Sequence, residues 1–214
     1  EKITQIDFIE SLFYKDLEVD ADLKDYVTNL DLTSIDHVKT NFYHTDPDKK
    51  LIDLTLKNVE PFFKDVGTQL KKNGMSVLKV WVQKYEENNY HPVHVHEPHH
   101  DSYSFIFYID CTETSAWTVF YSPGYPYVDH TTFKLEPKAG RCVLFPGALP
   151  HEAMPNNDKA RLIVSGNIRF HGYLFSRFKS LTIILSLKVY ALGILPIKPT
   201  TFLESSTIHP ISQS

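Results

Sequence analysis

Apolar residues in the first third of the chain recur at intervals of three and four. One cluster covers residues 6–13 and a longer series covers residues 51–70. This spacing places apolar side chains on one face of a helix. Asp46-Pro47 provides an N-cap followed by a proline at the first helical position, and Asn73-Gly74 is typical of a helix end. The pattern therefore predicts a helical N-terminal portion over residues 1–74.

From residue 75 onward the pattern changes to short runs rich in Val, Ile, Phe, Tyr and Trp, separated by Pro, Gly and Asn. Such runs predict β-strands, here over residues 75–85, 102–109, 116–121, 131–135, 141–145 and 161–170. Short strands at regular spacing are typical of a sandwich, barrel or jelly roll. We expect a single, mainly β domain over residues 1–171, with the helical lead at 1–74 and the β core at 75–171.

Residues 172–214 form a tail whose pattern differs from that of the preceding strands. The apolar run at 181–195 is interrupted by Ser186, Lys188 and Gly193. It is shorter than the roughly 20 residues that a membrane-spanning helix needs. A packed strand or helix, an interfacial segment and a non-native reading-frame tail are the alternatives that the sequence leaves open. We expect no membrane partner.

The charge balance and the cysteine count narrow the function classes. The 214-residue chain has a net charge of -4 and a pI near 6.3, and it lacks the basic stripe that nucleic-acid binding needs. A small-molecule or peptide substrate is expected instead. Cys111 and Cys142 are too few for a disulfide framework, and residues 1–5 do not resemble a signal peptide, so the expected location is the cytoplasm. No motif indicates an oligomeric state.

Five of the eleven histidines lie between positions 91 and 100. In an extended segment, His94 and His96 project to the same side and can reach one metal ion. His99 and Asp101 have the same spacing and would supply the commoner set of two histidines and one carboxylate. A solvated histidine-rich loop that binds metals only adventitiously is the alternative for this segment taken alone.

His151 follows an apolar run and a Pro-Gly turn, and Arg161 opens another run ten residues later. Alternation places Ser165 and Asn167 on the same face as Arg161, where they can line one pocket. A fixed guanidinium there would bind a carboxylate through two parallel hydrogen bonds. A structural histidine and a surface ion pair are the alternatives. Because imidazole suits iron and three ligands leave positions open, the pattern indicates an iron site beside an anion-binding arginine.

Five features follow one another in a fixed order along the chain. They are a Trp-bearing strand (Trp81), His94-Val95-His96, the aromatic strand Ser104-Phe105-Ile106-Phe107-Tyr108, Gly140 with Phe145-Pro146 and His151, and the strand from Arg161 to Asn167. In these features the chain resembles the iron(II)- and 2-oxoglutarate-dependent oxygenases, in particular a poorly characterised bacterial and phage-type group. The resemblance covers about residues 75–170.

The resemblance implies a double-stranded β-helix fold, of the cupin-like jelly-roll type. It also implies that His94 and His151 bind iron(II), that His96 stands where relatives carry Asp or Glu, and that Arg161 binds the distal carboxylate of 2-oxoglutarate. Three alternatives are open for the remaining ligand: His96 binds iron, Asp101 takes its place, or the site has only two protein ligands. Many relatives have a serine where this chain has Ile163. The chain would then either make fewer contacts with the co-substrate or make that contact through Ser165 or an aromatic residue.

The activity implied by the resemblance is hydroxylation of a substrate by O2, with release of succinate and CO2. Two other functions remain open from the sequence. One is a cupin-like metalloenzyme that works without 2-oxoglutarate, and the other is a non-catalytic jelly-roll binding module.

Overall fold

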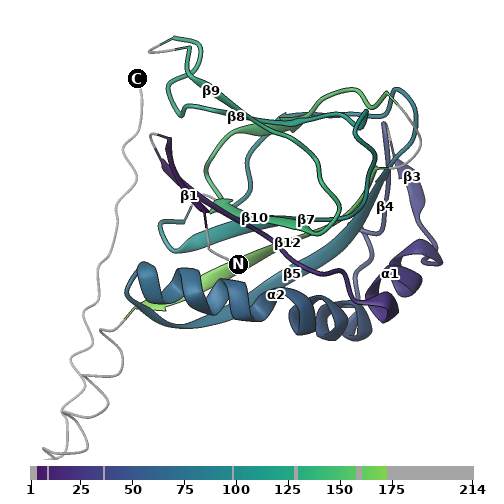
Figure 1. Cartoon of the computed structure of the whole chain (residues 1–214), viewed down its shortest axis with the longest axis horizontal. Helices are drawn as coiled ribbons and strands as arrows, with labels where there is room; N and C mark the ends of the chain where they lie inside the picture. The colour runs from purple at the N-terminus through teal and green to yellow at the C-terminus, as the bar shows by residue number, and fades with distance from the viewer. Residues whose placement is uncertain are drawn as a thin grey trace, which may run out of the picture. The chain divides into compact units, whose positions relative to one another are not determined.

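The computed structural model describes residues 4–8, 10–35, 37–97, 99–127, 130–157 and 161–172. All of them belong to a compact unit over Glu1–Tyr173, and Leu174–Ser214 form a second unit. The expectations for the tail from residue 173 onward lie outside the described residues. Among the described residues, a pair of antiparallel sheets face each other, and two helices lie on the outer side of the larger sheet (Figure 1).

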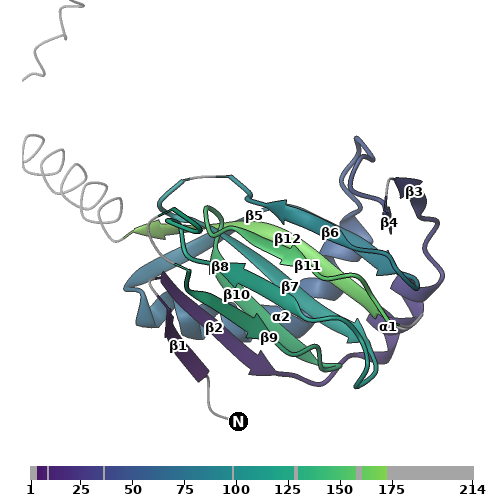
Figure 2. The same ribbon diagram turned by 90° about the horizontal axis from the view of Figure 1, so that it is seen from above.

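The larger sheet has eight strands in the order β1-β2-β10-β7-β12-β5-β4-β3. Their bounds are Thr4–Phe8 (β1), Glu10–Asp16 (β2), Arg141–Pro146 (β10), Ser102–Asp110 (β7), Arg161–Gly172 (β12), Lys72–Tyr85 (β5), Val38–Thr40 (β4) and Thr33–Ile35 (β3). The smaller sheet has the order β6-β11-β8-β9, with bounds His91–His94 (β6), His151–Ala153 (β11), Thr118–Tyr121 (β8) and Thr132–Leu135 (β9). Figure 2, seen from above, shows the smaller sheet in front of the larger one. The six strands predicted beyond residue 75 are all present.

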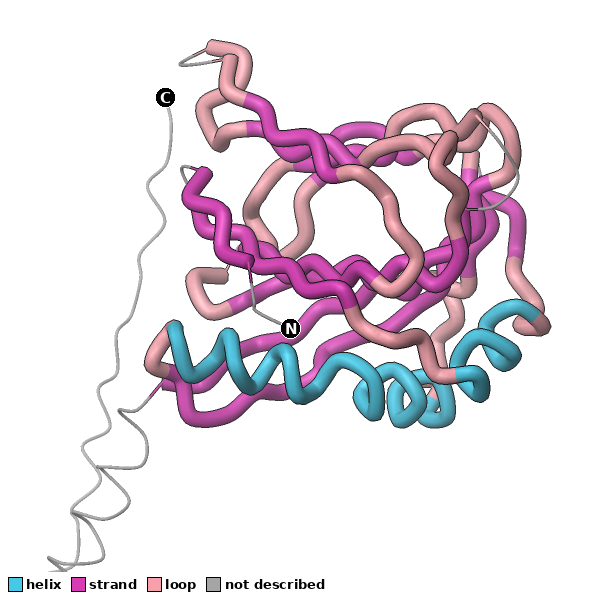
Figure 3. The backbone as a smooth tube through the Cα atoms, viewed as in Figure 1, coloured by secondary structure: helices cyan, strands magenta, loops and turns pink. Residues whose placement is uncertain are grey.

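Both described helices belong to the N-terminal portion, as predicted, and the rest of the described chain is mainly β (Figure 3). They are α1, Ala21–Thr28, and α2, Lys49–Gln69. Asp48, not Asp46, caps α2, because its carboxylate accepts a hydrogen bond from the Leu51 N–H at 2.9 Å. Asn73-Gly74 lie within β5 and do not end the helix. Neither of these two described helices is long and apolar enough to cross a membrane.

The expectation of a helix at residues 6–13 was wrong, because this segment forms the hairpin of β1 and β2. β2 also pairs with β10, so it lies inside the sheet. Leu12 packs between the two sheets and Phe13 packs on the helix side. A strand buried on both faces carries consecutive apolar residues, and its pattern then lacks the alternation that would distinguish it from a helix.

Two apolar cores flank the larger sheet. One lies between this sheet and the helices, and the other lies between the two sheets. β7 contributes to both by alternation: Phe105 and Phe107 face the helices, whereas Ile106 and Tyr108 face the smaller sheet. The face of β7 that carries Ile106 and Tyr108 is therefore directed toward the smaller sheet, whose strands carry histidines of the predicted site.

Candidate functional site

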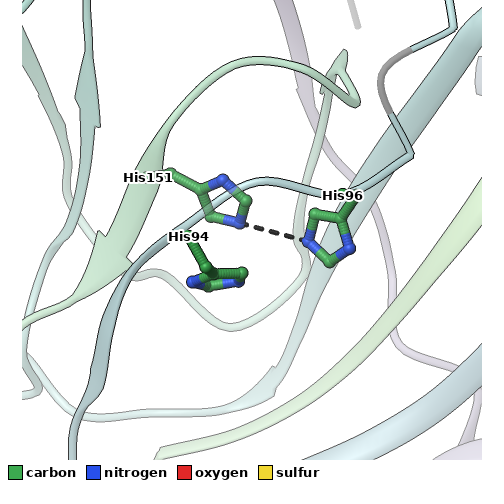
Figure 4. Close-up of side chains that lie close together, drawn as sticks. All are labelled: His94, His96 and His151. Atoms are coloured by element: carbon green, nitrogen blue, oxygen red, sulfur yellow. Dashed lines mark hydrogen bonds between the residues drawn. The ribbon is translucent and has the colours of Figure 1, made fainter. Parts of the chain in front are cut away.

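Three imidazoles gather at one end of the smaller sheet. His94 ends β6, His96 follows it by two residues, and His151 begins β11. The antiparallel register places His151 directly opposite His94. One ring nitrogen from each of the three residues lies within 4.8 Å of the other two, and the rings point toward one another (Figure 4). The structure thus brings together three residues that the sequence predicted as ligands.

Backbone carbonyls orient two of these rings. His94 Nδ1 lies 2.8 Å from the Pro92 carbonyl oxygen, and His151 Nδ1 lies 3.0 Å from that of Leu149. A carbonyl oxygen only accepts hydrogen bonds, so both Nδ1 atoms carry the proton and both Nε2 atoms carry a lone pair. Metal-binding histidines are commonly held in this way, with the second ring nitrogen donating to a backbone carbonyl.

Burial keeps the three rings in the neutral form that binds metals. Desolvation, aided by neighbouring imidazoles, lowers the pKa of His96 to about 4. The pKa of His151 lies well below its ordinary value for the same reasons, and desolvation lowers that of His94. At neutral pH these side chains therefore need not lose a proton to the solvent before they bind a cation.

A β-bulge brings a fourth imidazole to the cluster. Opposite Glu152 of β11, β6 has two residues, Pro92 and Val93, instead of one. The extra residue turns His91 to the same side as His94, and the two rings stack with centroids 3.9 Å apart. Sequence reasoning missed His91, although a proline within an edge strand often marks a bulge.

The fallback ligands lie elsewhere. His99, His100 and Asp101 form a separate group in which both histidines are exposed. The Asp101 carboxylate contacts Lys72 Nζ at 2.6 Å and His100 Nε2 at 2.9 Å. Among the described residues, the group of His94, His96 and His151 includes no carboxylate.

Arg161, the first residue of β12, is 1% exposed, so a surface ion pair is not its role. Its Nη2 donates to Thr118 Oγ1 at 2.8 Å, and its guanidinium carbon lies 4.8 Å from the centre of the Tyr85 ring. Within the described portion of the chain, Arg161 Nε and Nη1 have no hydrogen-bond partner. Buried N–H groups on a charged side chain are costly when unpaired, so these atoms suit a bound anion.

Thr118 connects Arg161 to a buried tyrosine. Its Oγ1 lies 2.6 Å from the Tyr108 hydroxyl and also accepts from Arg161. Desolvation raises the pKa of Tyr108, so its hydroxyl stays protonated. Sequence reasoning did not select Thr118, because nothing in its surroundings within β8 distinguishes it from an ordinary strand residue.

The arginine and the imidazoles share one small cavity between the sheets. Its lining includes Arg161, Thr118 and Ser165 together with all four imidazoles of the cluster. Ser165 Oγ donates to Gln83 Oε1 at 3.2 Å.

The predicted place of Asn167 was wrong. This residue is not in the lining of the cavity and accepts a hydrogen bond from Ser104 at 2.8 Å. It shares a strand face with Arg161 but lies six residues away, about 20 Å along an extended strand.

No protein-family model and no curated protein sequence matches the chain. Solved structures do match at the level of fold. A 2OG-Fe(II) oxygenase family oxidoreductase from Burkholderia pseudomallei has a TM-score of 0.57 and 12% identity, over 70% of this chain and 76% of that one. The epimerase SnoN from nogalamycin biosynthesis has a TM-score of 0.56 and 13% identity, over 75% and 78% of the two chains.

A third similar structure is the viral collagen prolyl hydroxylase of Paramecium bursaria Chlorella virus-1, in complex with 2-oxoglutarate. Its TM-score is 0.54 and its identity 15%, over 74% of this chain and 94% of that one. Identities this low establish architecture only. The two facing antiparallel sheets and these similarities show that the chain has the double-stranded β-helix fold of the 2OG-Fe(II) oxygenases.

Proposed function

We propose that this protein is an iron(II)- and 2-oxoglutarate-dependent dioxygenase that hydroxylates a small-molecule or peptidyl substrate. The observation that carries the proposal is the shared cavity. A buried arginine with unpaired N–H groups lines the same space as a cluster of neutral imidazoles. An anion-binding group beside a metal-binding group fits a co-substrate that bears a carboxylate at each end.

His94, His96 and His151 would hold the iron. Their nitrogen donors suit iron(II), and three protein ligands leave open positions. Neighbouring carbonyls already orient the rings of His94 and His151, which lowers the cost of assembling the site. When bound, iron and 2-oxoglutarate supply the activation of O2, with succinate and CO2 as products.

Arg161 would bind the distal carboxylate of 2-oxoglutarate through its unpaired Nε and Nη1 groups. Thr118 Oγ1 accepts a hydrogen bond from Arg161 and shares another with the Tyr108 hydroxyl, in which either oxygen can be the donor. With Tyr108 as the donor, the Thr118 proton would be available to donate to the same carboxylate. Thr118 would thus replace the serine contact that Ile163 cannot make. Ser165 lines the same cavity and lies within hydrogen-bonding distance of Gln83.

Two features bear on partners and location. The neighbours of similar fold include a prolyl hydroxylase and an epimerase from nogalamycin biosynthesis, so the fold is compatible with both peptide and small-molecule substrates. The chain has only two cysteines, Cys111 and Cys142, too few for a disulfide framework, which fits the reducing conditions of the cytoplasm.

The test is anaerobic titration of the full chain with iron(II) and 2-oxoglutarate, followed by measurement of succinate in air. The wild-type protein should develop a visible charge-transfer band and release succinate. Arg161→Met should weaken 2-oxoglutarate binding at least about 100-fold, since a charge-assisted bidentate contact is lost. Arg169→Met, on the same strand but paired with Glu97 at the surface, is the matched control. Absence of the band in folded wild-type protein would overturn the proposal.

A cupin-like metalloenzyme without 2-oxoglutarate is the second candidate, because the ligand group in the described residues holds three imidazoles and no carboxylate. It predicts metal-dependent turnover that neither requires 2-oxoglutarate nor changes in Arg161→Met. A non-catalytic binding module would instead bind its ligand without any metal-dependent product.

A further inference from the structure

A second, larger hollow lies against the imidazole cluster. It has a volume of about 480 Å³, within the usual range for sites that enclose small ligands. Its walls come from the β3–β4 hairpin, from β5 and from the segment that begins with β6. The lining residues are Ile35, His37, Val38, Thr40, Phe42, Tyr43, Trp81, Gln83, Tyr90, His91, Pro92, His94, Val95 and His96. We call this hollow the aromatic groove.

Aromatic side chains are packed into the walls of the aromatic groove. The Phe42 ring meets Trp81 edge-on, with centroids 5.0 Å apart. The His37 ring stacks on Tyr90 at 4.2 Å. These contacts hold flat rings in fixed positions, so that a ligand would meet preformed apolar surfaces.

The aromatic groove extends to the candidate metal site. Trp81 lies between the two, with its ring centroid 5.7 Å from that of His96. Trp81, Gln83, His91, His94 and His96 line both the aromatic groove and the cavity that contains Arg161. A molecule bound in the aromatic groove would therefore place a C–H bond next to the imidazoles.

Among the described residues that line the aromatic groove, none has an Asp, Glu, Lys or Arg side chain. The nearby Lys39 and Glu86 are paired with each other at 2.9 Å. Lys79 lies over the Phe42 ring, 3.9 Å from its centroid, but it lines a different hollow. A charged ligand group in the aromatic groove would lose hydration without gaining a counter-ion, which is unfavourable.

The charge of the loaded site also disfavours a cation. Three neutral imidazoles add no negative charge, so iron(II), Arg161 and the 2-oxoglutarate dianion would leave a net positive charge beside the aromatic groove. A cationic ligand would be repelled across this short distance. The apolar walls and the lack of counter-ions among the described lining residues favour an uncharged ligand, and the positive charge adds a further penalty for a cation.

We propose that the aromatic groove binds an uncharged small molecule through an aryl group packed against Phe42, Trp81 and Tyr90. The inference deepens the proposed function, because it names the substrate class of the same site. The ligand would enter between the β3–β4 hairpin and β6, with its aryl ring on Trp81 and a neighbouring carbon toward His94 and His96.

Trp81 supplies the signal for the test. The chain has two tryptophans, so in full-length Trp117→Phe the emission reports Trp81 alone. Trp117 lies outside the lining of the aromatic groove. Metal-free protein is titrated with 3-phenylpropan-1-ol, 3-phenylpropanoate and 3-phenylpropylammonium, which share one skeleton and differ in charge. The alcohol should change the Trp81 emission saturably, and both ions should bind at least about tenfold more weakly.

Two variants locate the binding. Phe42→Leu should weaken binding of the alcohol about tenfold, since an aromatic contact is lost while an apolar side chain remains. Tyr127→Leu, in which the replaced side chain is 96% exposed and outside the aromatic groove, should leave binding unchanged. Equal or tighter binding of either ion, no saturable change with any probe, or equal losses in both variants would overturn the inference.

The metal-free design separates this inference from the proposed function. If iron and 2-oxoglutarate bind but the alcohol does not, the substrate class is wrong and the dioxygenase proposal stands. If the alcohol binds but the charge-transfer band is absent, the aromatic groove stands as a binding site and the dioxygenase proposal fails.

Discussion

Nε2 of His96 lies 3.3 Å from Nε2 of His151, although 55 positions separate the two residues in the chain. The Nδ1 proton of His151 is already donated to the Leu149 carbonyl, so the proton between the two rings belongs to His96. A metal ion that takes this place would require the His96 proton to leave Nε2. The contact between His96 and His151 thus marks a position where a metal cation can take the place of the shared proton.

His151→Ala should lower the affinity of the protein for iron(II) or cobalt(II) by at least about 100-fold. Removing a residue that only hydrogen-bonds a metal ligand can already weaken metal binding by up to about 100-fold, and removing the ligand itself should weaken it at least as much. The measurement is anaerobic competition against a chromophoric chelator. His99→Ala, which alters the separate surface group, should leave the affinity unchanged. A comparable loss in His99→Ala would mean that the metal binds at the surface instead.

Thr118→Val should weaken 2-oxoglutarate binding about tenfold, since the hydrogen bond from an uncharged hydroxyl to the carboxylate is lost and Arg161 Nη2 loses its acceptor. Valine has nearly the same shape as threonine, so packing in β8 is kept. Calorimetry on the cobalt-loaded protein measures this affinity. Metal affinity without 2-oxoglutarate should not change, and an unchanged co-substrate affinity would exclude Thr118 from the carboxylate site.

Acid should destabilise the metal-free protein most steeply between pH 6.5 and about 4. Desolvation, with a contribution from His94, lowers the pKa of His91 to about 4, and burial lowers the pKa of His96 to a similar value. In that window the unfolded chain binds more protons than the folded protein, so the free energy of unfolding falls as the pH falls.

Chemical denaturation at a series of pH values checks this expectation. His91→Phe keeps an aromatic ring against His94 but removes one histidine with a lowered pKa. The free energy of unfolding of this variant should therefore depend less steeply on pH. The control His44→Gln changes an exposed histidine and should follow the wild-type curve. A wild-type stability that does not change across this window would contradict the neutral, buried state of the cluster.

Gly166→Ala should destabilise the protein by about 1–3 kcal/mol, the usual cost of overpacking a core. A Cβ at Gly166 would lie 2.4 Å from the ring of Phe105 and 2.7 Å from the Lys79 carbonyl oxygen. Phe105 is itself fully buried and cannot easily move. Gly172→Ala, on the same strand with open space around it, should change the free energy of unfolding little. Denaturant titration of both variants makes the comparison, and equal effects would contradict the close approach of β12 to β7.

The sequence by itself determined six of the strands from residue 75 onward, though not β6 and β11, and it determined the identity of the three gathered imidazoles. Alternating or β-branched runs between Pro and Gly turns specify strands locally, as for β7 and β10. The i, i+2 spacing of His94 and His96 is also a local property, because an extended backbone alone places both on one side.

Only the tertiary structure decided the form of the N-terminal segment and which other residues join the candidate site. The segment at residues 6–13 became a hairpin because neighbours cover both faces of β2, and no local pattern records such burial. His91 joined the cluster through a bulge, and Thr118 met Arg161 from 43 positions away. Asn167 shared a face with Arg161 but lay too far along the strand. Which distant residues meet depends on sheet register and strand order, and those follow from the packing of the whole chain.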